Sequence, residues 1–403
     1  MTIGAATTPQ RISQSEFVAL VAMLVAAVAF SIDAMLPAMP RIASELTPDA
    51  PNLAQLIITS FVFGLGIGTF FAGPLSDSFG RKPVIFFGAA LYICSSALAW
   101  FASSLELLLA ARALQGLGAS ATRVVPMAIV RDLYEGRAMA QITSFIMMVF
   151  TLVPAVAPLI GSAIIALTGW RGIFAAFILF SLMSTAWLAL RVIETWPRTR
   201  RRPFRIGALI QSAKTVMSHP TVQLSTAAQA LCMTALFASL SSIHQIFDVT
   251  YDKAESFPWW FALIAVVAGG FSLLNAMLVI RLGMKRLLII AMSLMIAVTV
   301  VILALDLLVF ASGLPFAVYI FWQGAIFVHT AMTLGNLSAL AMEPMGAVAG
   351  MAASVITGLA TVGAVVFTIP IGLSFNGTAL PLMIGALIAV GVALWLARKV
   401  EDV

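Results

Sequence analysis

Apolar runs of about twenty residues alternate with short polar turns along almost the whole chain. A helix needs roughly 20 apolar residues to cross the hydrocarbon core of a bilayer, and twelve segments meet that length. These predicted spans are Phe17–Pro40, Leu53–Ser76, Val84–Ser103, Leu105–Val130, Ala140–Ile165, Gly172–Val192, Thr221–Phe247, Phe257–Ile280, Leu287–Ala311, Leu314–Ala341, Gly350–Ser374 and Thr378–Ala397. The pattern predicts an all-α integral membrane protein with twelve transmembrane helices.

The distribution of basic residues predicts the orientation of these helices. With the N-terminus placed in the cytoplasm, seventeen Lys and Arg residues fall in cytoplasmic segments and only three in outer loops. Cytoplasmic loops carry the excess of Lys and Arg, so both termini are predicted to be cytoplasmic. The first span is longer than a signal-peptide core and no small-residue cleavage site follows it, so we expect it to be retained.

The longest connection, Arg191–Pro220, divides the predicted spans six and six. The expected domains are an N-terminal six-helix bundle at 1–190, a cytoplasmic linker at 191–220 and a C-terminal six-helix bundle at 221–403. The linker contains a basic cluster and then an amphipathic segment, which favours an anchor on the membrane surface. Binding of anionic lipid or of a partner by the cluster is the alternative.

Two short sequences recur at equivalent places in the two halves. Ser78–Lys82, after the second span, parallels Arg281–Lys285, after the eighth. Leu114–Leu117 parallels Trp322–Ala325 near the start of the fourth and tenth spans. Parallel repeats of this kind predict a binding site at the interface between the two bundles.

Composition excludes a soluble protein. The chain is 62% hydrophobic and 9% charged, against about 25% charged residues in an ordinary globular domain. The net charge of +6 does not predict nucleic-acid binding, because no basic patch is interleaved with aromatic residues. Cys94 and Cys232 lie in apolar segments and indicate neither a disulfide framework nor a metal site. No catalytic triad or phosphate-binding loop is present, so we expect neither an enzyme nor a cofactor.

Ionisable residues inside a bilayer cost about 2.5 kcal/mol or more and therefore need a reason. Phe17–Ile32 is too short to cross the core, so the first span is expected to continue through Asp33 towards Pro40. Asp33 then lies about 10 Å below the outer end, at the same depth as Arg112 in the fourth span. We expect the two to pair, with a proton or cationic substrate competing for the carboxylate; an interfacial Asp33, or a pair that only holds helices together, is the alternative.

Arg123 follows Arg112 by eleven residues, which brings both within about 20° of one helix face. Arg112, Gly116, Ala119 and Arg123 therefore form a stripe that is predicted to line a cavity, with Arg123 near its cytoplasmic mouth. Snorkelling of Arg123 to lipid phosphate is the competing interpretation.

The second half contains fewer polar residues in its spans. Gln323, His329 and Asn336 lie in the tenth span, and the last two share a face. We expect Gln115, Gln323, His329, Asn275 and Met147 to join Asp33, Arg112 and Arg123 in the substrate cavity, although packing against helices or lipid is an equal alternative for Asn275 and Met147. Asp306 and His244 lie near outer span ends, where an interfacial role is favoured.

The turn between the second and third spans reads G-P-L-S-D-S-F-G-R-K-P and resembles the loop 2–3 signature of the major facilitator superfamily. The matching positions are Gly73, Leu75, Asp77, Gly80, Arg81 and Lys82. In the fourth span, Arg112–Gly118 resembles the R-x-x-Q-G-x-G motif of proton-coupled members, and that span ends in Arg131 and Asp132.

Two further segments narrow the resemblance. Val153–Gly161 is similar to the antiporter motif of drug:proton exporters, with Pro154, Pro158 and Gly161 in place and with Ala157 for one glycine. Asp33–Pro40 resembles the D-x-x-L-P-x-x-P segment of the Bcr/CflA type. The chain is thus identified as a member of the major facilitator superfamily, of the drug:H⁺ antiporter and Bcr/CflA-type multidrug efflux class.

The resemblance implies export of amphipathic drug-like compounds across the bacterial inner membrane in exchange for protons, and hence antibiotic resistance. It assigns proton coupling to Asp33 and Arg112 and a cytoplasmic gate to Gly73, Asp77, Gly80, Arg81, Arg131 and Asp132. The expected partners are the small-molecule substrate, protons and membrane lipid, with the chain as a monomer driven by the proton gradient. A transporter specific for one anionic or zwitterionic metabolite, in either direction, is the alternative.

The sequence also predicts how the gate works. Asp77 is expected to lie opposite Gly346–Gly350, at the start of the eleventh span. A helix N-terminus carries about half a positive charge, so Asp77 beside it would stabilise the state with closed cytoplasmic ends.

Overall fold

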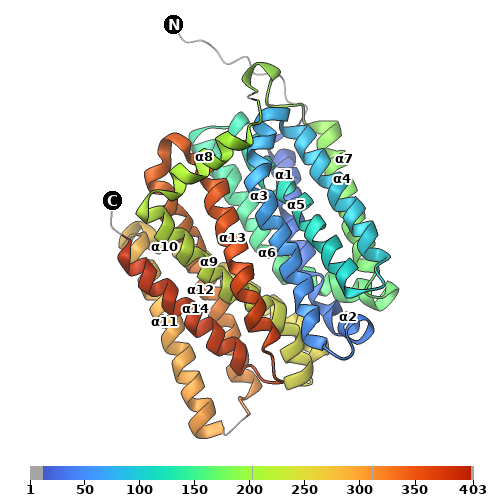
Figure 1. Ribbon diagram of the computed structural model, residues 1–403, viewed down its shortest axis with the longest axis vertical. Helices are drawn as coiled ribbons and strands as arrows, with labels where there is room; N and C mark the ends of the chain where they lie inside the picture. Colours follow the sequence, from blue (N-terminus) through green and yellow to red (C-terminus); the bar gives the residue numbers. More distant parts are fainter. Residues whose placement is uncertain (1–11, 202, 311–312, 401–403) are drawn as a thin grey trace.

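The computed structural model describes residues 12–201, 203–310 and 313–400, and within them it contains helices and turns but no β-strand (Figure 1). The α-helices are α1 Gln14–Asp33, α2 Met39–Leu46, α3 Leu56–Phe79, α4 Arg81–Trp100, α5 Leu105–Leu133, α6 Gly136–Thr168, α7 Gly172–Arg191, α8 Ile206–Met217, α9 Pro220–Gln245, α10 Phe257–Leu282, α11 Met284–Leu305, α12 Phe316–Met342, α13 Ala349–Leu373 and α14 Leu380–Lys399. Twelve segments in the described part are long and apolar enough to span a membrane, which confirms the predicted fold class. Arg11, Arg202 and Ala311 lie outside the described residues.

Each predicted span corresponds to one observed span. The seventh and ninth end in short π-helical segments, Ile246–Thr250 and Asp306–Phe310, and the first contains a break. Regular α-helix ends at Asp33, a short 3₁₀ helix covers Leu36–Ala38, and α2 begins at Met39. Pro37 and Pro40 supply no backbone N–H donor and sit in the first turns of the two new segments, where proline is tolerated. The span continues through Asp33 and Pro40, as expected, to Leu46, but the regular α-helix ends at Asp33.

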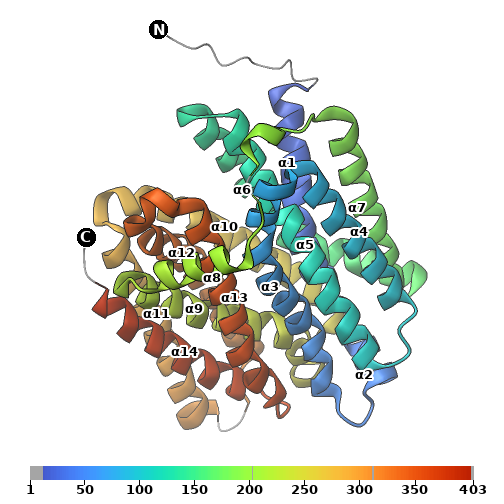
Figure 2. The same ribbon diagram turned by 45° about the horizontal axis from the view of Figure 1, so that its top comes forward.

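The first six spans pack mainly against one another, as do the last six, and two helix pairs make most of the contacts between the groups. These pairs are α3 with α13 and α6 with α10 (Figures 1 and 2). Small residues permit the first contact: Gly66 lies against Thr361, and Gly358 lies against the ring of Phe70. A substrate path between the two groups has to open along these pairs.

The two ends of the molecule differ in charge. We call the end that carries the α3–α4 turn and α8 the basic end, at the top of Figure 1, and the end with α2 the opposite end. The linker contacts both groups of helices at the basic end. Its Glu194 carboxylate accepts hydrogen bonds from the backbone N–H groups of Arg81 and Lys82, and its helix α8 packs on α13 through a cluster that includes Val216 and Val355.

Candidate functional site

Arg112 is fully buried inside the N-terminal group of helices. Its guanidinium donates to the carbonyl oxygens of Ser31 at 3.0 Å and Ile57 at 3.3 Å, and to Oε1 of Gln115 at 2.5 Å. The Phe61 ring lies under it at 4.4 Å. These contacts use carbonyls, an amide and an aromatic face, so the charge is held without any carboxylate partner among the described residues.

Glycines in α5 explain how this arginine comes to be enclosed. A Cβ on Gly116 would lie 1.9 Å from the carbonyl oxygen of Phe61, and one on Gly118 would lie 2.5 Å from that of Gly88. Both positions therefore have to lack a side chain for α3 and α4 to pack on α5. Gln115, between Arg112 and these glycines, also donates to Ser96 Oγ at 2.6 Å, which fixes its orientation.

Asp33 is 4% exposed, and no described residue forms a hydrogen bond or ion pair with its carboxyl group. The predicted direct pair with Arg112 is thus absent from this structure. Arg112 instead reaches the carbonyl of Ser31, two residues before Asp33, because helix α1 offers an unpaired acceptor in its last turn. Asp33 follows by two residues the carbonyl that Arg112 binds, so the two residues lie in the same region of the bundle.

Helix α6 packs directly after Asp33. A Cβ on Gly161 would lie 2.2 Å from the carbonyl oxygen of Ala34, so this glycine permits contact between α6 and the break in the first span. The helix continues through Pro154 and Pro158 from Gly136 to Thr168. The segment that resembles the antiporter motif therefore forms the wall beside the unpaired carboxyl group.

A pocket of about 440 Å³ opens between the two groups of helices at the basic end. Its walls come from α1, α3, α5 and α6 on one side and from α13 on the other, and they include Arg123 and Met147. Arg112 and Gln115 are fully buried away from it, and Ala119 is also buried, because α3 covers this face of α5. The predicted stripe therefore meets the pocket only at its Arg123 end.

The polar residues of the second half also lie away from this pocket. Gln323 is fully buried and donates to Ser239, while His329 is 2% exposed. Asn275 accepts a hydrogen bond from Asn336 at 2.9 Å. Gln323, His329 and Asn275 were predicted to line the cavity. Here Gln323 and Asn275 form hydrogen bonds within the C-terminal group, whereas both ring nitrogens of His329 are buried without a partner among the described residues.

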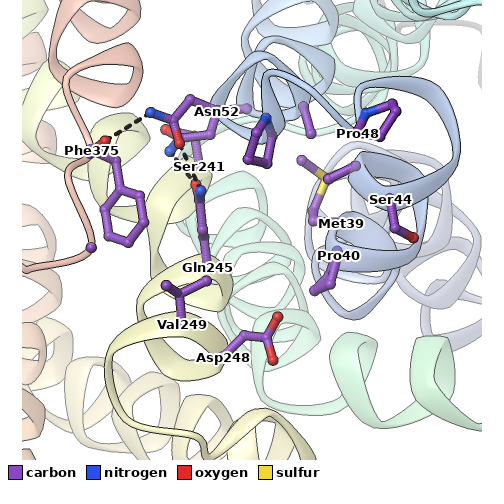
Figure 3. Close-up of a pocket in the computed structure, with 15 residues that line it drawn as sticks. Met39, Pro40, Ser44, Pro48, Asn52, Ser241, Gln245, Asp248, Val249 and Phe375 are labelled. Atoms are coloured by element: carbon purple, nitrogen blue, oxygen red, sulfur yellow. Dashed lines mark hydrogen bonds between the residues drawn. The ribbon is translucent and has the colours of Figure 1, made fainter.

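Hydrogen bonds between the two groups join their spans at the opposite end, beside a second pocket (Figure 3). Asn52 donates to the Phe375 carbonyl at 2.8 Å and accepts from Gln245 at 2.8 Å. Gln55 donates to Gln245 at 2.7 Å and accepts from Ser242 at 3.0 Å. Asn52, Gln55 and Gln245 were not among the predicted site residues, because uncharged polar residues at span ends give no distinctive pattern in the sequence.

Arg81 organises the predicted gate residues at the basic end. It bonds Asp77 at 2.5 Å and Asp132 at 2.8 and 3.2 Å, and the ring of Trp196 in the linker stacks on it. Gly80 before it has φ of +105°, a conformation that favours glycine. Asp77, Arg81 and Asp132 thus come together as predicted.

The other two gate candidates lie elsewhere. Gly73 faces Ser354 of α13, at the contact between the two groups of helices, whereas Arg131 lines the pocket. Asp77 bonds within its own half rather than to the start of α13 in this structure. The predicted contact between Asp77 and the eleventh span is therefore not formed here.

Comparison with known proteins places this geometry in context. A family model described as "Major Facilitator Superfamily" matches residues 19–368. An uncharacterized MFS-type transporter of Bacillus subtilis is 29% identical over 84% of this chain and 83% of its own. The bicyclomycin resistance protein homolog of Haemophilus influenzae is 29% identical, covering 66% of each chain. A chloramphenicol resistance protein of Pseudomonas aeruginosa is 38% identical, over 42% of this chain and 39% of its own.

Solved structures agree on the fold. A D-xylose-proton symporter superposes with a TM-score of 0.78 at 17% identity, covering 97% of this chain and 100% of that one. At that identity the likeness concerns the arrangement of helices alone.

Proposed function

The chain belongs to the major facilitator superfamily, whose members are transporters rather than enzymes, and on that premise we propose that it exports amphipathic drug-like compounds in exchange for protons. The bacterial inner membrane is the proposed location. Relatives named for bicyclomycin, chloramphenicol and multidrug resistance support an efflux role.

The observation that carries the proton coupling is the isolation of Asp33. A buried carboxyl group without a donor or cation is held at least cost as the neutral acid. In this state we propose that Asp33 carries a proton, while Arg112 is occupied by Ser31, Ile57 and Gln115. Loss of that proton would create a charge two residues from the carbonyl that binds Arg112, so protonation and the position of the arginine would be coupled.

The state of the two ends fits one step of alternating access. Pockets of about 440 Å³ lie between the groups at both ends, but among the described residues the side-chain hydrogen bonds between the groups are formed at the opposite end alone. With the basic end in the cytoplasm, this is an inward-facing form that would take up substrate from the cytoplasm. Deprotonation of Asp33, next to the α1 break and Gly161, would then accompany the change of state.

A drug panel on an efflux-deficient strain tests this proposal. Expression of the chain should raise resistance to several unrelated amphipathic compounds, and a protonophore should remove the gain. Resistance that survives the protonophore would contradict proton coupling.

One observation favours a second candidate, a transporter of a single anionic or zwitterionic metabolite. The pocket at the basic end contains two arginines, Arg123 and Arg131, and no acidic residue among its described lining. Counterflow with labelled solutes separates the candidates, because unrelated lipophilic compounds inhibit a polyspecific pump and leave a specific carrier unaffected.

A further inference from the structure

The pocket at the basic end combines free positive charge with an apolar wall. Arg123 and Arg131 are its charged residues, Thr143 and Ser354 bring hydroxyl groups, and Met147 and Phe150 are among its apolar residues. Its described lining includes no Asp or Glu side chain that would neutralise the arginines. A site of this composition suits a ligand with one acidic group and an apolar body.

The two arginines are available to a ligand, in contrast to the other buried arginine of α5. Arg123 and Arg131 form no hydrogen bond or ion pair with any described residue, and both retain access to solvent. The guanidinium of Arg112 already donates hydrogen bonds to Ser31, Ile57 and Gln115. Arg123 is therefore an unneutralised cation on a membrane-spanning helix, and an anion in the pocket would remove that cost.

Arg131 brings the second half of the molecule into the site. A guanidinium nitrogen of Arg131 lies 3.9 Å from where a Cβ on Gly350 would stand, at the start of α13. The pocket thus has cationic donors from α5 facing an α13 segment with Ser354 on its surface. A ligand held between them would touch both groups of helices, as a substrate that moves between states has to do.

We infer that this pocket binds the acidic group of a monoanionic amphipathic carboxylate, with Arg123 and Arg131 contacting the carboxylate and Met147 and Phe150 covering the apolar body. The inference rests on the proposed function in one respect, that the pocket is part of the transport path. On this inference, Arg123 selects ligands by the charge of their head group.

Three probes with one apolar body isolate the charge of the head group. These are 3-phenylpropionate, 3-phenylpropionamide and 3-phenylpropylamine, which are anionic, neutral and cationic at pH 7. Affinities come from the concentration dependence of the thermal unfolding temperature of the purified full-length protein in detergent, followed by tryptophan fluorescence. We expect the anion to bind about tenfold more tightly than the amide, as one additional charge-assisted hydrogen bond predicts.

Matched variants locate that preference. Arg123→Gln should remove it, Arg123→Lys should retain part of it, and Arg131→Gln should weaken it. Arg137→Gln is the control, because Arg137 is exposed at the same end but does not line the pocket, and it should bind as the wild type does. Equal affinities for the three probes, no response to any of them, or an anion preference that survives both Arg123→Gln and Arg131→Gln would overturn the inference.

A lipid arm separates a soluble anion from an anionic head group. The same proteins are compared in nanodiscs of phosphatidylcholine with and without phosphatidylglycerol. Stabilisation by phosphatidylglycerol that Arg123→Gln abolishes, without any response to 3-phenylpropionate, would assign the site to lipid and refute the carboxylate. Binding is measured without a proton gradient. A protein that shows no anion preference could therefore still export by proton exchange, and a protein that does not export could still show the preference.

Discussion

The two groups of six helices share an architecture but hold their polar residues differently. The N-terminal group encloses an unpaired carboxyl group at Asp33 and a fully buried cation at Arg112. The C-terminal group places neutral amides at comparable depth, with Gln323 bonded to Ser239 and Asn336 bonded to Asn275. The C-terminal group also buries a carboxyl group, Asp306. We expect the coupling chemistry in the first half, because Asp33 lies two residues from the carbonyl that binds the buried cation Arg112.

The two repeated turns show the same division. Gly80 after α3 and Gly283 after α10 both have positive φ, at +105° and +78°, so each half needs glycine to reverse direction. Asp77 precedes the first turn and bonds Arg81, whereas an isoleucine, Ile280, stands at the equivalent place and is 86% exposed. The backbone requirement is shared by the turns, but the aspartate that pairs with Arg81 has no acidic counterpart at Ile280.

The largest effect is expected for substitution of Asp33, and we compare it with substitution of Asp306 in the other half. Asp33→Asn should reduce proton-driven export to background while the protein still inserts and folds, because an amide of the same shape cannot gain and lose a proton. Drug accumulation in everted vesicles, whose outer surface is the cytoplasmic face of the membrane, is measured across an imposed pH gradient.

Asp306→Asn is the matched control for this experiment. Asp306 is 6% exposed and its Oδ1 has no partner among the described residues, yet it lies in the C-terminal group. We expect this variant to retain efflux close to the wild type. Equal losses in both variants would end the assignment of coupling to the N-terminal group.

The next effect concerns Arg112 and its neutral counterpart. Arg112→Ala leaves Gln115 and two backbone carbonyls without their donor and opens a cavity, so we expect a loss of about 3 kcal/mol in unfolding free energy together with loss of export. Gln323→Ala removes one buried hydrogen bond, from the Gln323 amide to Ser239, and should lower the unfolding free energy by about 1 kcal/mol.

The unfolding free energies of Arg112→Ala and Gln323→Ala are compared by fluorescence. Arg112→Lys tests the effect of the charge alone. The lysine variant should recover part of the stability and little of the export, because one ammonium group cannot reach three acceptors in the planar arrangement of the guanidinium. Full export by Arg112→Lys would show that charge at this position is sufficient.

The sequence predicted the spans because length and hydropathy alone set them in a membrane. It predicted Asp33 close to Arg112 from the fixed rise of a helix, and Arg112 binds the carbonyl two residues before Asp33. It failed on their pairing, because periodicity does not say which neighbour supplies an acceptor, and the break at Pro37 and Pro40 left carbonyls available near Ser31. It also placed Gln323 and His329 in the cavity, although both side chains are buried within the C-terminal group of helices.

A third prediction compares glycines at equivalent places in the repeated Gln-Gly pairs. Gly116→Ala would bring a methyl group against the Phe61 carbonyl, whereas Gly324→Ala meets no atom within 4 Å. The first should destabilise the protein by about 1–3 kcal/mol through overpacking. The second should stabilise it by up to about 1 kcal/mol, because alanine is the better helix former. Thermal unfolding of both variants measures the difference, and a shared sign would show that the α3–α5 contact is looser than this structure has it.

The smallest expected effect concerns Asp77, whose equivalent position in the second turn is Ile280. Asp77 is 53% exposed in its side chain, and its loss leaves Arg81 bonded to Asp132 through two nitrogen atoms. An exposed ion pair contributes about 0.2–1 kcal/mol, so Asp77→Asn should leave the fold intact. In the alternate state, with the basic end closed, we expect Asp77 to face the positive N-terminus of α13, and the asparagine variant would lose that interaction.

Asp77→Asn should therefore shift the population towards the form described here, by several-fold for about 1 kcal/mol. Maleimide labelling of Thr143→Cys, in the pocket at the basic end, reports the shift after Cys94 and Cys232 have been replaced by alanine. The control is Ile280→Asn at the equivalent turn, which has no carboxylate to lose and should label as the unmodified turn does. Labelling that rises in Ile280→Asn as much as in Asp77→Asn would mean that the two turns gate alike, and the contrast between the halves would then be confined to Asp33 and Arg112.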